Sequence, residues 1–180
     1  VSASLAVSIF DVLALPPSQL IEMAGPCVSS FKDTKARVAL CATSATIESG
    51  MYQNAFRMIG KGIQAFAISD LAGAIERGAP LEECEKYIRD AFSAIDADSY
   101  DVLVLGCTHY PLVSDVFKKV VGDKKLFDPA TAVAERILRD LWPREMGYGK
   151  TRFYISKDSA RFRALATEIF PKSDFSIEVV

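Results

Sequence analysis

Short, strongly apolar runs alternate along the chain with stretches whose apolar residues recur every three or four positions. The short runs predict buried β-strands, and the periodic stretches predict amphipathic helices that pack on a sheet. Regular alternation of the two is typical of an α/β protein with parallel strands. The predicted strands are residues 37–43, 63–69, 100–106, 124–128, 151–156 and 175–180.

Several of the helices between these strands have recognisable starts. Thr46 is predicted to cap a helix that follows the first strand. Pro80 suits the first turn of a long helix that carries Cys84 on its apolar stripe, which makes Cys84 a core residue. Asp128 and Pro129 form a cap and first-turn pair for a later helix. Shorter helices are predicted around residues 113–120 and 162–169.

The pattern predicts two layers of parallel strands, with domain boundaries near residues 13–17 and 126–130. The apolar opening stretch, residues 1–17, has no charged leader and is too short to span a bilayer. We therefore expect it to be buried within the protein.

Composition excludes several classes of partner. The formal net charge is −2, and the Lys and Arg residues are scattered without a basic tract, so neither a nucleic acid nor a membrane surface is expected to bind. The four cysteines lie far apart and only one histidine accompanies them, which argues against a structural metal site. Free thiols fit a reducing compartment, so a cytoplasmic location is expected.

The stretch VLVLGCTHYPL, residues 102–112, combines a buried strand with reactive side chains. Ligands of parallel sheets bind beyond the carboxyl ends of the strands, which is where Gly106 and Cys107 fall. Thr108 adds a hydroxyl and His109 an imidazole before Pro111 opens the next helix. The N–H groups of that helix start would suit a substrate carboxylate and lower the pKa of the Cys107 thiol.

Each cysteine also has a structural interpretation, because cysteine is among the most buried residue types. Cys27 and Cys84 are interpreted as core residues, and so is Cys41, although its position late in a strand keeps a functional role open. For Cys107 and His109 the pattern alone leaves both interpretations open.

The sequence LGCTHYPL closely resembles the second cysteine motif of the glutamate racemases, which are cofactor-independent members of the aspartate/glutamate racemase family. The stretch ALCATSATIESGMYQNAF is similar to a segment in which a strand leads into Thr-x-x-Thr-Ile and a helix. FDPATAVAERI and TRFYISKDSARFRALATEIF also resemble segments of the family. Together these segments cover most of the chain.

The resemblance implies an α/β fold of two three-layer parallel-sheet domains, the first one incomplete. Residues 15–127 would form a complete second domain with the Cys-Thr-His motif, and residues 1–14 with 128–180 would form the remainder of the first. VSAS, at residues 1–4, looks like the small residues that follow the family's first catalytic cysteine. We therefore expect a fragment that lacks this cysteine and is inactive alone.

Racemisation without a cofactor requires a base on one face of Cα and an acid on the other, and two thiols suit this task. The resemblance implies that Cys107 is one catalytic thiol and that His109 assists proton transfer and binds substrate. It also implies that Thr108, Thr43 and Thr46 contact the amino acid. The expected substrate is glutamate, converted to D-glutamate for peptidoglycan by a cytoplasmic homodimer with neither cofactor nor metal.

Three alternatives remain. A related two-cysteine enzyme would act on aspartate or another acid, although many aspartate racemases carry a glutamate where this chain has His109. A Cys-His acyl-transfer enzyme would use Cys107 as a nucleophile. A non-catalytic remnant would only bind an amino acid or a partner. Exchange of the Cα hydrogen in heavy water distinguishes the racemases from the other two.

Overall fold

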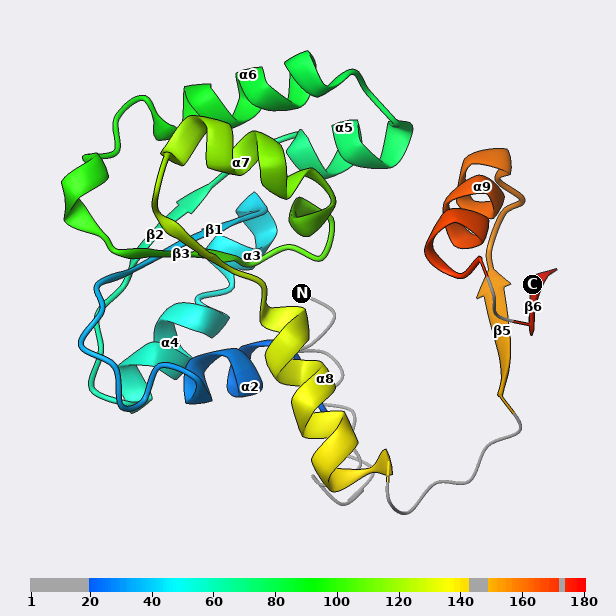
Figure 1. Cartoon of the computed structure of the whole chain (residues 1–180), viewed down its shortest axis with the longest axis horizontal. Helices are drawn as coiled ribbons and strands as arrows, with labels where there is room; N and C mark the ends of the chain where they lie inside the picture. The colour runs from blue at the N-terminus through cyan, green and yellow to red at the C-terminus, as the bar shows by residue number, and fades with distance from the viewer. Residues whose placement is uncertain (1–19, 143–148, 172–173) are drawn as a thin grey trace. The chain divides into compact units, whose positions relative to one another are not determined.

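An open parallel sheet of four strands forms the centre of the first part of the chain, in the order β2-β1-β3-β4 (Figure 1). The computed structural model describes residues 20–142, 149–171 and 174–180. Neighbouring strands are parallel throughout the sheet, as the sequence predicts. The strands are β1 (Val38–Ala42), β2 (Gln64–Ala67), β3 (Val102–Leu105) and β4 (Lys125–Phe127).

Alternate residues of the central strands enter two separate hydrophobic cores, because successive side chains of a strand point to opposite faces. Leu40 and Val104 enter one core, whereas Cys41 and Leu105 enter the other. Every residue of β1 and β3 is buried, which explains why their sequences are continuous apolar runs. The first core is covered by α2 (Ala24–Ser29) and α4 (Met51–Met58), and the second by α5 (Leu71–Arg77), α6 (Leu81–Phe92) and α7 (Ser114–Val121).

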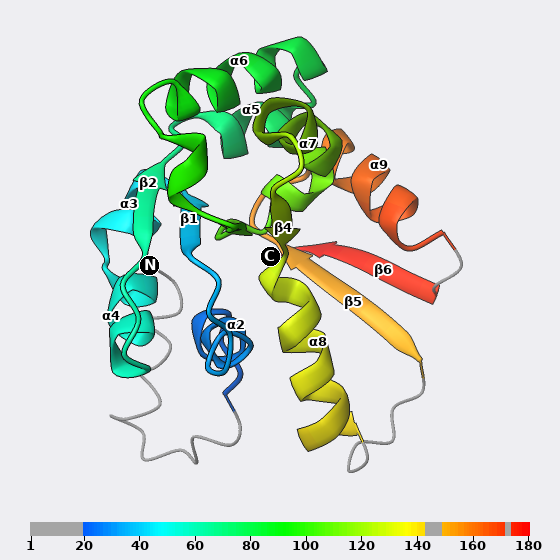
Figure 2. The same cartoon turned by 60° about the vertical axis from the view of Figure 1, so that its left-hand side comes forward.

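Helices therefore lie on both faces of the sheet, as Figures 1 and 2 show. The chain leaves β1 through α3 (Ser44–Glu48) toward the face of α2 and α4. It leaves β2 and β3 toward the opposite face, the latter through the 3-10 turn η3 (Tyr110–Val113). A second short 3-10 turn, η2 (Ala97–Ser99), precedes β3. The predicted α/β class with parallel strands is confirmed.

The helical segment after β1 differs from the sequence prediction. Thr46 does not cap it; the N-cap is Thr43, whose side chain accepts a hydrogen bond from the backbone N–H of Thr46. The expected single helix is divided into α3 and α4 by Gly50, which has a φ of 65°. A left-handed residue ends a helix. Apolar spacing could not locate this break, because both helices pack on the same core.

Other helix starts agree with the sequence. Helix α8 (Pro129–Asp140) begins at Pro129, and the Asp128 carboxylate accepts a hydrogen bond of 2.9 Å from the backbone N–H of Ala130. Helix α6 begins directly after Pro80 and buries Cys84 in the core. Two short helices, α2 and α5, were not predicted, because they are too short to show a clear periodicity.

The structure divides into two compact units, Val1–Arg139 and Asp140–Val180. In the second unit, β5 (Lys150–Ile155) pairs in parallel with β6 (Asp174–Val179), and α9 (Ala160–Ile169) connects them (Figure 2). The ring of Phe153 lies 5.6 Å from that of Phe162 and 5.7 Å from that of Phe175, centroid to centroid. Both strands and the helix were predicted from sequence.

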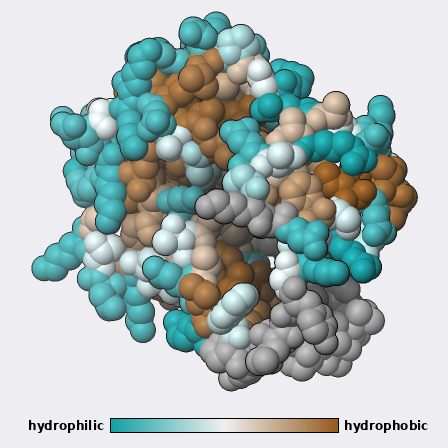
Figure 3. Space-filling view, turned by 45° about the vertical axis from the view of Figure 1, so that its right-hand side comes forward, coloured by the Kyte–Doolittle hydropathy of each residue, from teal (hydrophilic) through white to brown (hydrophobic). Residues whose placement is uncertain are grey.

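Large apolar side chains remain on the surface among hydrophilic ones (Figure 3). Leu138 is 57% exposed and Trp142 67% exposed, and in the second unit Tyr154 and Val179 are more than half exposed. Exposed apolar surface is where a further protein surface can pack. No helix in the described ranges is both long enough and apolar enough to cross a membrane.

Some predictions fall outside the described residues. They are the buried opening stretch at residues 1–17, the boundary near residues 13–17 and most of the loop at 142–150. The grouping of residues 1–14 with 128–180 as one domain, and of 15–127 as the other, also stays a prediction.

An ion pair joins the starts of β1 and β3. The Arg37 guanidinium Nη2 lies 2.6 Å from Oδ1 of Asp101, and its Nε and backbone N–H both donate to Oδ2. Arg37 also donates to the backbone carbonyl of Asp98. These bonds hold the pKa of Asp101 down at about 2, with the side-chain hydrogen bond from Arg37 as the largest cause.

We predict that Asp101→Asn lowers the melting temperature at neutral pH. A carboxyl group whose pKa is lowered by folding stabilises the folded state above its unfolded pKa, and this stabilisation is lost as pH falls through the folded value of about 2. The difference in melting temperature between wild type and variant should therefore narrow as pH falls below 4, measured by circular dichroism. Asp123→Asn, at another exposed carboxylate, is the control. A difference that stays constant with pH would contradict this role of the ion pair.

Candidate functional site

The carboxyl ends of three parallel strands meet at one edge of the sheet, and polar residues follow each strand. Thr43 follows β1, Ser69 lies just beyond β2, and the Cys-Thr-His motif follows β3. The chain leaves β1 toward one face of the sheet and leaves the adjacent β3 toward the other. In open α/β sheets, ligands usually bind at the point where neighbouring connections diverge in this way.

Gly106 brings the motif directly against β1. Its N–H donates a 2.8 Å hydrogen bond to the carbonyl of Cys41. A Cβ atom at this position would lie 2.6 Å from Leu40 Cδ1, 3.1 Å from Ala42 Cβ and 3.2 Å from the Cys41 carbonyl oxygen. A larger residue here would therefore force these neighbouring atoms to shift.

Cys107 and His109 lie together as the spacing suggests. The Cys107 Sγ is 4.0 Å from Nδ1 of His109, and both residues are half-buried. The Cys107 side chain packs against the core at its inner side without being sealed in it. A thiol in contact with an imidazole and open to solvent on one side can exchange a proton with a ligand.

Burial raises the pKa of the Cys107 thiol, and the hydrogen bonds from the backbone N–H groups of His109 and Tyr110 oppose this. The sequence analysis predicts that N–H groups at the start of the next helix lower the pKa of the Cys107 thiol. These groups do act against the effect of burial, but the predicted net lowering of the pKa is wrong. The reason is that desolvation exceeds the contribution of the two N–H groups. The thiol is therefore mainly protonated at neutral pH in the absence of a ligand.

Tyr110 anchors the turn that carries these groups. Its side chain is fully buried, and its hydroxyl donates a 3.0 Å hydrogen bond to the carbonyl of Ile68 at the end of β2. Its backbone N–H donates to the carbonyl of Cys107 over 3.1 Å. The motif is thus tied to the end of β2 as well as to β1.

The threonines of the predicted site fall into two positions. Thr43, the N-cap of α3, and Thr46 lie together, with their Oγ1 atoms 3.0 Å apart. Thr108 lies beside Cys107 and is exposed. Because β1 and β3 are adjacent and parallel, the threonines after β1 and the thiol after β3 follow neighbouring strand ends at the same edge of the sheet. The substrate-binding roles of these residues stay predictions.

The three other cysteines lie in the cores. Cys27, Cys41 and Cys84 are at most 1% exposed. Burial raises the pKa of Cys27 to about 12 and that of Cys41 well above its usual value. The Cys41 thiol donates to the carbonyl of Val104 at 3.6 Å, so its late position in β1 does not bring it out of the core. Cys107 is the one partly exposed thiol in the chain.

Two polar residues of this edge escaped the sequence analysis. Ser44 Oγ and Ser69 Oγ lie 3.2 Å apart and join the ends of β1 and β2. Ser69 ends a predicted strand, so the rule that parallel strands end at one edge could have identified it. A lone serine carries no motif, however, and its pairing with Ser44 depends on strand order.

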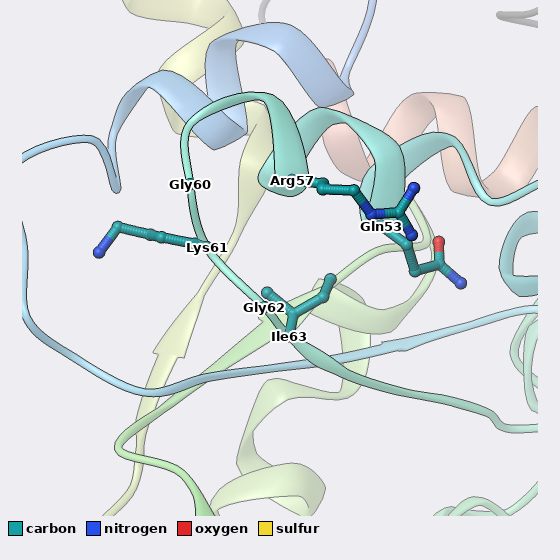
Figure 4. Close-up of a pocket in the computed structure, with 6 residues that line it drawn as sticks. All are labelled: Gln53, Arg57, Gly60, Lys61, Gly62 and Ile63. Carbon is teal, nitrogen blue, oxygen red and sulfur yellow. The ribbon is translucent and has the colours of Figure 1, made fainter.

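A cavity of about 470 Å³ lies at the opposite edge of the sheet (Figure 4). It is lined by Gln53 and Arg57 of α4 and by residues 60–63, which lead into the amino end of β2. In Figure 4 the Lys61 side chain extends away from Arg57, and its ammonium donates to the carbonyl of Thr34. This cavity does not include the Cys-Thr-His motif.

Comparison with known proteins agrees with the motif. The family model described as Asp/Glu/Hydantoin racemase matches residues 15–137, which include both threonines and the Cys-Thr-His motif. The chain belongs to this racemase family. The resemblance of the sequence motifs is thus confirmed at the level of the family.

Individual relatives are glutamate racemases. The chain is 36% identical over 138 residues to the glutamate racemase of Roseobacter denitrificans, an alignment that covers 73% of this chain and 51% of the relative. A glutamate racemase isoform of Bacillus anthracis matches the fold with a TM-score of 0.82 at 24% identity, over 99% of this chain and 70% of that one. The glutamate racemase of Francisella tularensis, solved in complex with D-glutamate, matches with a TM-score of 0.76 at 23% identity, over 89% of this chain and 63% of that one.

These alignments also define the extent of the match. The chain spans about half the length of the first curated relatives it matches. Because the two structural matches have sequence identities below 25%, they show that this chain shares the fold of those proteins.

Proposed function

We propose that this chain carries one catalytic half of a glutamate racemase site, with Cys107 as the proton-transferring thiol. The observation that carries the proposal is the contact of the half-buried Cys107 thiol with the His109 imidazole just beyond the carboxyl end of β3. Membership of the racemase family supports the reaction class. The relative solved with D-glutamate supports glutamate as the substrate.

The proposed step is a proton transfer at Cα. The Cys107 thiolate removes the α-hydrogen, which leaves a protonated thiol and a carbanion whose charge extends into the substrate carboxylate. N–H groups and hydroxyls at the ends of β1 and β3 stabilise that charge. His109, in contact with the thiol, takes up its proton before the step and assists its return. Thr43, Thr46 and Thr108 are proposed to bind the amino acid.

The half-site interpretation rests on the number of usable thiols. Inversion needs a second acid on the other face of the substrate, but the remaining three cysteines of this chain are buried in its cores. We therefore propose that the first catalytic cysteine of the family lies outside these 180 residues. The complete enzyme is proposed to be a cofactor-independent cytoplasmic homodimer that supplies D-glutamate for peptidoglycan.

The test is to incubate the chain with L-glutamate in heavy water. Proton NMR should show loss of the Cα hydrogen signal, and chiral chromatography should show no D-glutamate, because one thiol returns a deuteron to the face it deprotonated. Formation of D-glutamate would mean that the chain supplies both catalysts and would contradict the half-site proposal. Absence of exchange would contradict the proposed function altogether.

A further inference from the structure

Tyr110 combines a buried hydroxyl with a position directly after His109. Its side chain is fully buried in the core that α5, α6 and α7 cover, and its ring lies 5.6 Å from that of Phe117 in α7, centroid to centroid. The hydroxyl donates a 3.0 Å hydrogen bond to the carbonyl of Ile68, which follows β2. Packing therefore fixes the ring, and a hydrogen bond fixes its polar end.

The Ile68 peptide is held from two sides. Its N–H donates to the carbonyl of Ala42 at the end of β1 over 2.9 Å, and its carbonyl accepts from Tyr110. The bond between Ile68 and Tyr110 is buried, so the carbonyl would have no ready partner if the hydroxyl were removed. An unpaired buried carbonyl is costly, and its presence favours a movement of the chain that exposes it to water.

Tyr110 is also the inner end of the turn that carries the thiol and the imidazole. In this turn, residues 106–110, Tyr110 is the one residue that is fully buried. Its backbone N–H donates to the carbonyl of Cys107 over 3.1 Å, which closes the turn. The position of the Tyr110 side chain therefore influences where Cys107 and His109 lie.

The contact within the turn is sensitive to such a shift. The Cys107 Sγ lies 4.0 Å from Nδ1 of His109, which is long for a hydrogen bond, so even a small displacement would separate the two groups. Burial raises the pKa of the Tyr110 hydroxyl. The hydroxyl therefore keeps its proton in neutral and moderately alkaline solution and remains a donor to Ile68.

We propose that Tyr110 is a positioning residue, whose hydrogen bond to Ile68 holds the turn where His109 can exchange a proton with Cys107. This inference deepens the proposed function of Cys107 and rests on it. The Tyr110 side chain is fully buried and acts only through the turn that it anchors.

Tyr110→Phe tests the inference, because it keeps the ring and removes the hydroxyl. Exchange of the Cα hydrogen of L-glutamate in heavy water should fall about tenfold, since a displaced catalytic group loses much of the benefit of orientation. Alkylation of Cys107 by iodoacetamide should become faster, because a loosened turn leaves the thiol less packed against the core. Para-fluorophenylalanine at this position fills the space of the hydroxyl without donating a proton, and it should change both rates in the same way.

Three comparisons separate positioning from a general loss of stability. Para-aminophenylalanine in place of Tyr110 restores an N–H donor and should restore both rates. His109→Ala should lower exchange less in the Tyr110→Phe background than in wild type, because the contact that it removes is already weakened. Tyr100→Phe, at a buried tyrosine of the same core that precedes β3, is the matched control and should change neither rate. Circular dichroism checks that each variant is folded.

The outcomes distinguish this inference from the proposed function. If wild type exchanges the Cα hydrogen and the folded Tyr110→Phe or para-fluorophenylalanine variant matches it in both rates, only the role of Tyr110 is overturned. Equal effects of His109→Ala in both backgrounds, or failure of para-aminophenylalanine to restore the rates, would overturn it as well. If wild type does not exchange the Cα hydrogen, the proposed function fails and the catalytic role of Tyr110 fails with it, whereas the alkylation rates still report whether Tyr110 holds the turn.

Discussion

Cys107→Ala should reduce exchange of the Cα hydrogen of glutamate by at least about a hundredfold, the usual contribution of a positioned acid or base. The thiol is the proposed proton carrier, and it is the one cysteine of the chain outside the hydrophobic cores. Exchange by wild type should increase with pH, because burial raises the pKa of this thiol and the thiolate forms only in alkaline solution. Proton NMR in heavy water measures both effects.

A matched cysteine variant shows whether the loss is specific. Cys84→Ala removes a buried thiol of α6, a helix that carries none of the candidate site residues, and should leave exchange unchanged while lowering stability slightly. Equal exchange in wild type and Cys107→Ala would rule out Cys107 as the proton carrier. His109→Ala should retain the thiol but lower the exchange rate, because the imidazole that is proposed to take up the thiol proton is lost.

Gly106→Ala should destabilise the fold by about 1–3 kcal/mol, the usual cost of overpacking a tight site. The added Cβ would stand 2.6 Å from the Leu40 side chain and 3.1 Å from Ala42 Cβ. Leu40 Cδ1 is the end of a side chain and can move, but the backbone carbonyl of Cys41, at 3.2 Å, cannot move without breaking its bond to Gly106. Urea denaturation measures the loss.

Gly62→Ala is the control for this substitution. A Cβ at Gly62 meets no atom within 4 Å, so the free energy of unfolding should stay near that of wild type.

The Gly106→Ala variant, by contrast, should force the ends of β1 and β3 apart. Alkylation of Cys107 by iodoacetamide should then become faster as the thiol loses its packing. If the urea concentration at the midpoint of unfolding is unchanged in Gly106→Ala, β1 can shift at this position without loss of stability, which would contradict the prediction.

Local sequence chemistry identified most elements of the fold. The near-continuous apolar run at residues 100–106 is typical of a strand buried on both faces. The Asp128 and Pro129 pair predicts the start of α8 because both residues act on the nearest backbone groups. The break at Gly50 escaped prediction, since a left-handed residue within a periodic stretch leaves the apolar spacing intact.

The candidate site was predictable where its residues are neighbours in sequence. Cys107 and His109 are two positions apart in a tight turn, so their contact needed no knowledge of the fold. The pairing of Ser44 with Ser69, 25 positions apart, depends on β1 lying beside β2. The raised pKa of the Cys107 thiol depends on how much of the core covers it, which no local pattern encodes.

The sequence by itself determined the α/β class, the strands and the Cys-Thr-His motif, because these follow from hydrophobic periodicity and from residues close together in the chain. Tertiary structure alone decided the strand order, the full burial of Cys41 and the pairing of Ser44 with Ser69 across two strand ends. The physical reason is that burial and long-range hydrogen bonds arise only when distant segments pack, and desolvation then sets which thiol can carry a proton.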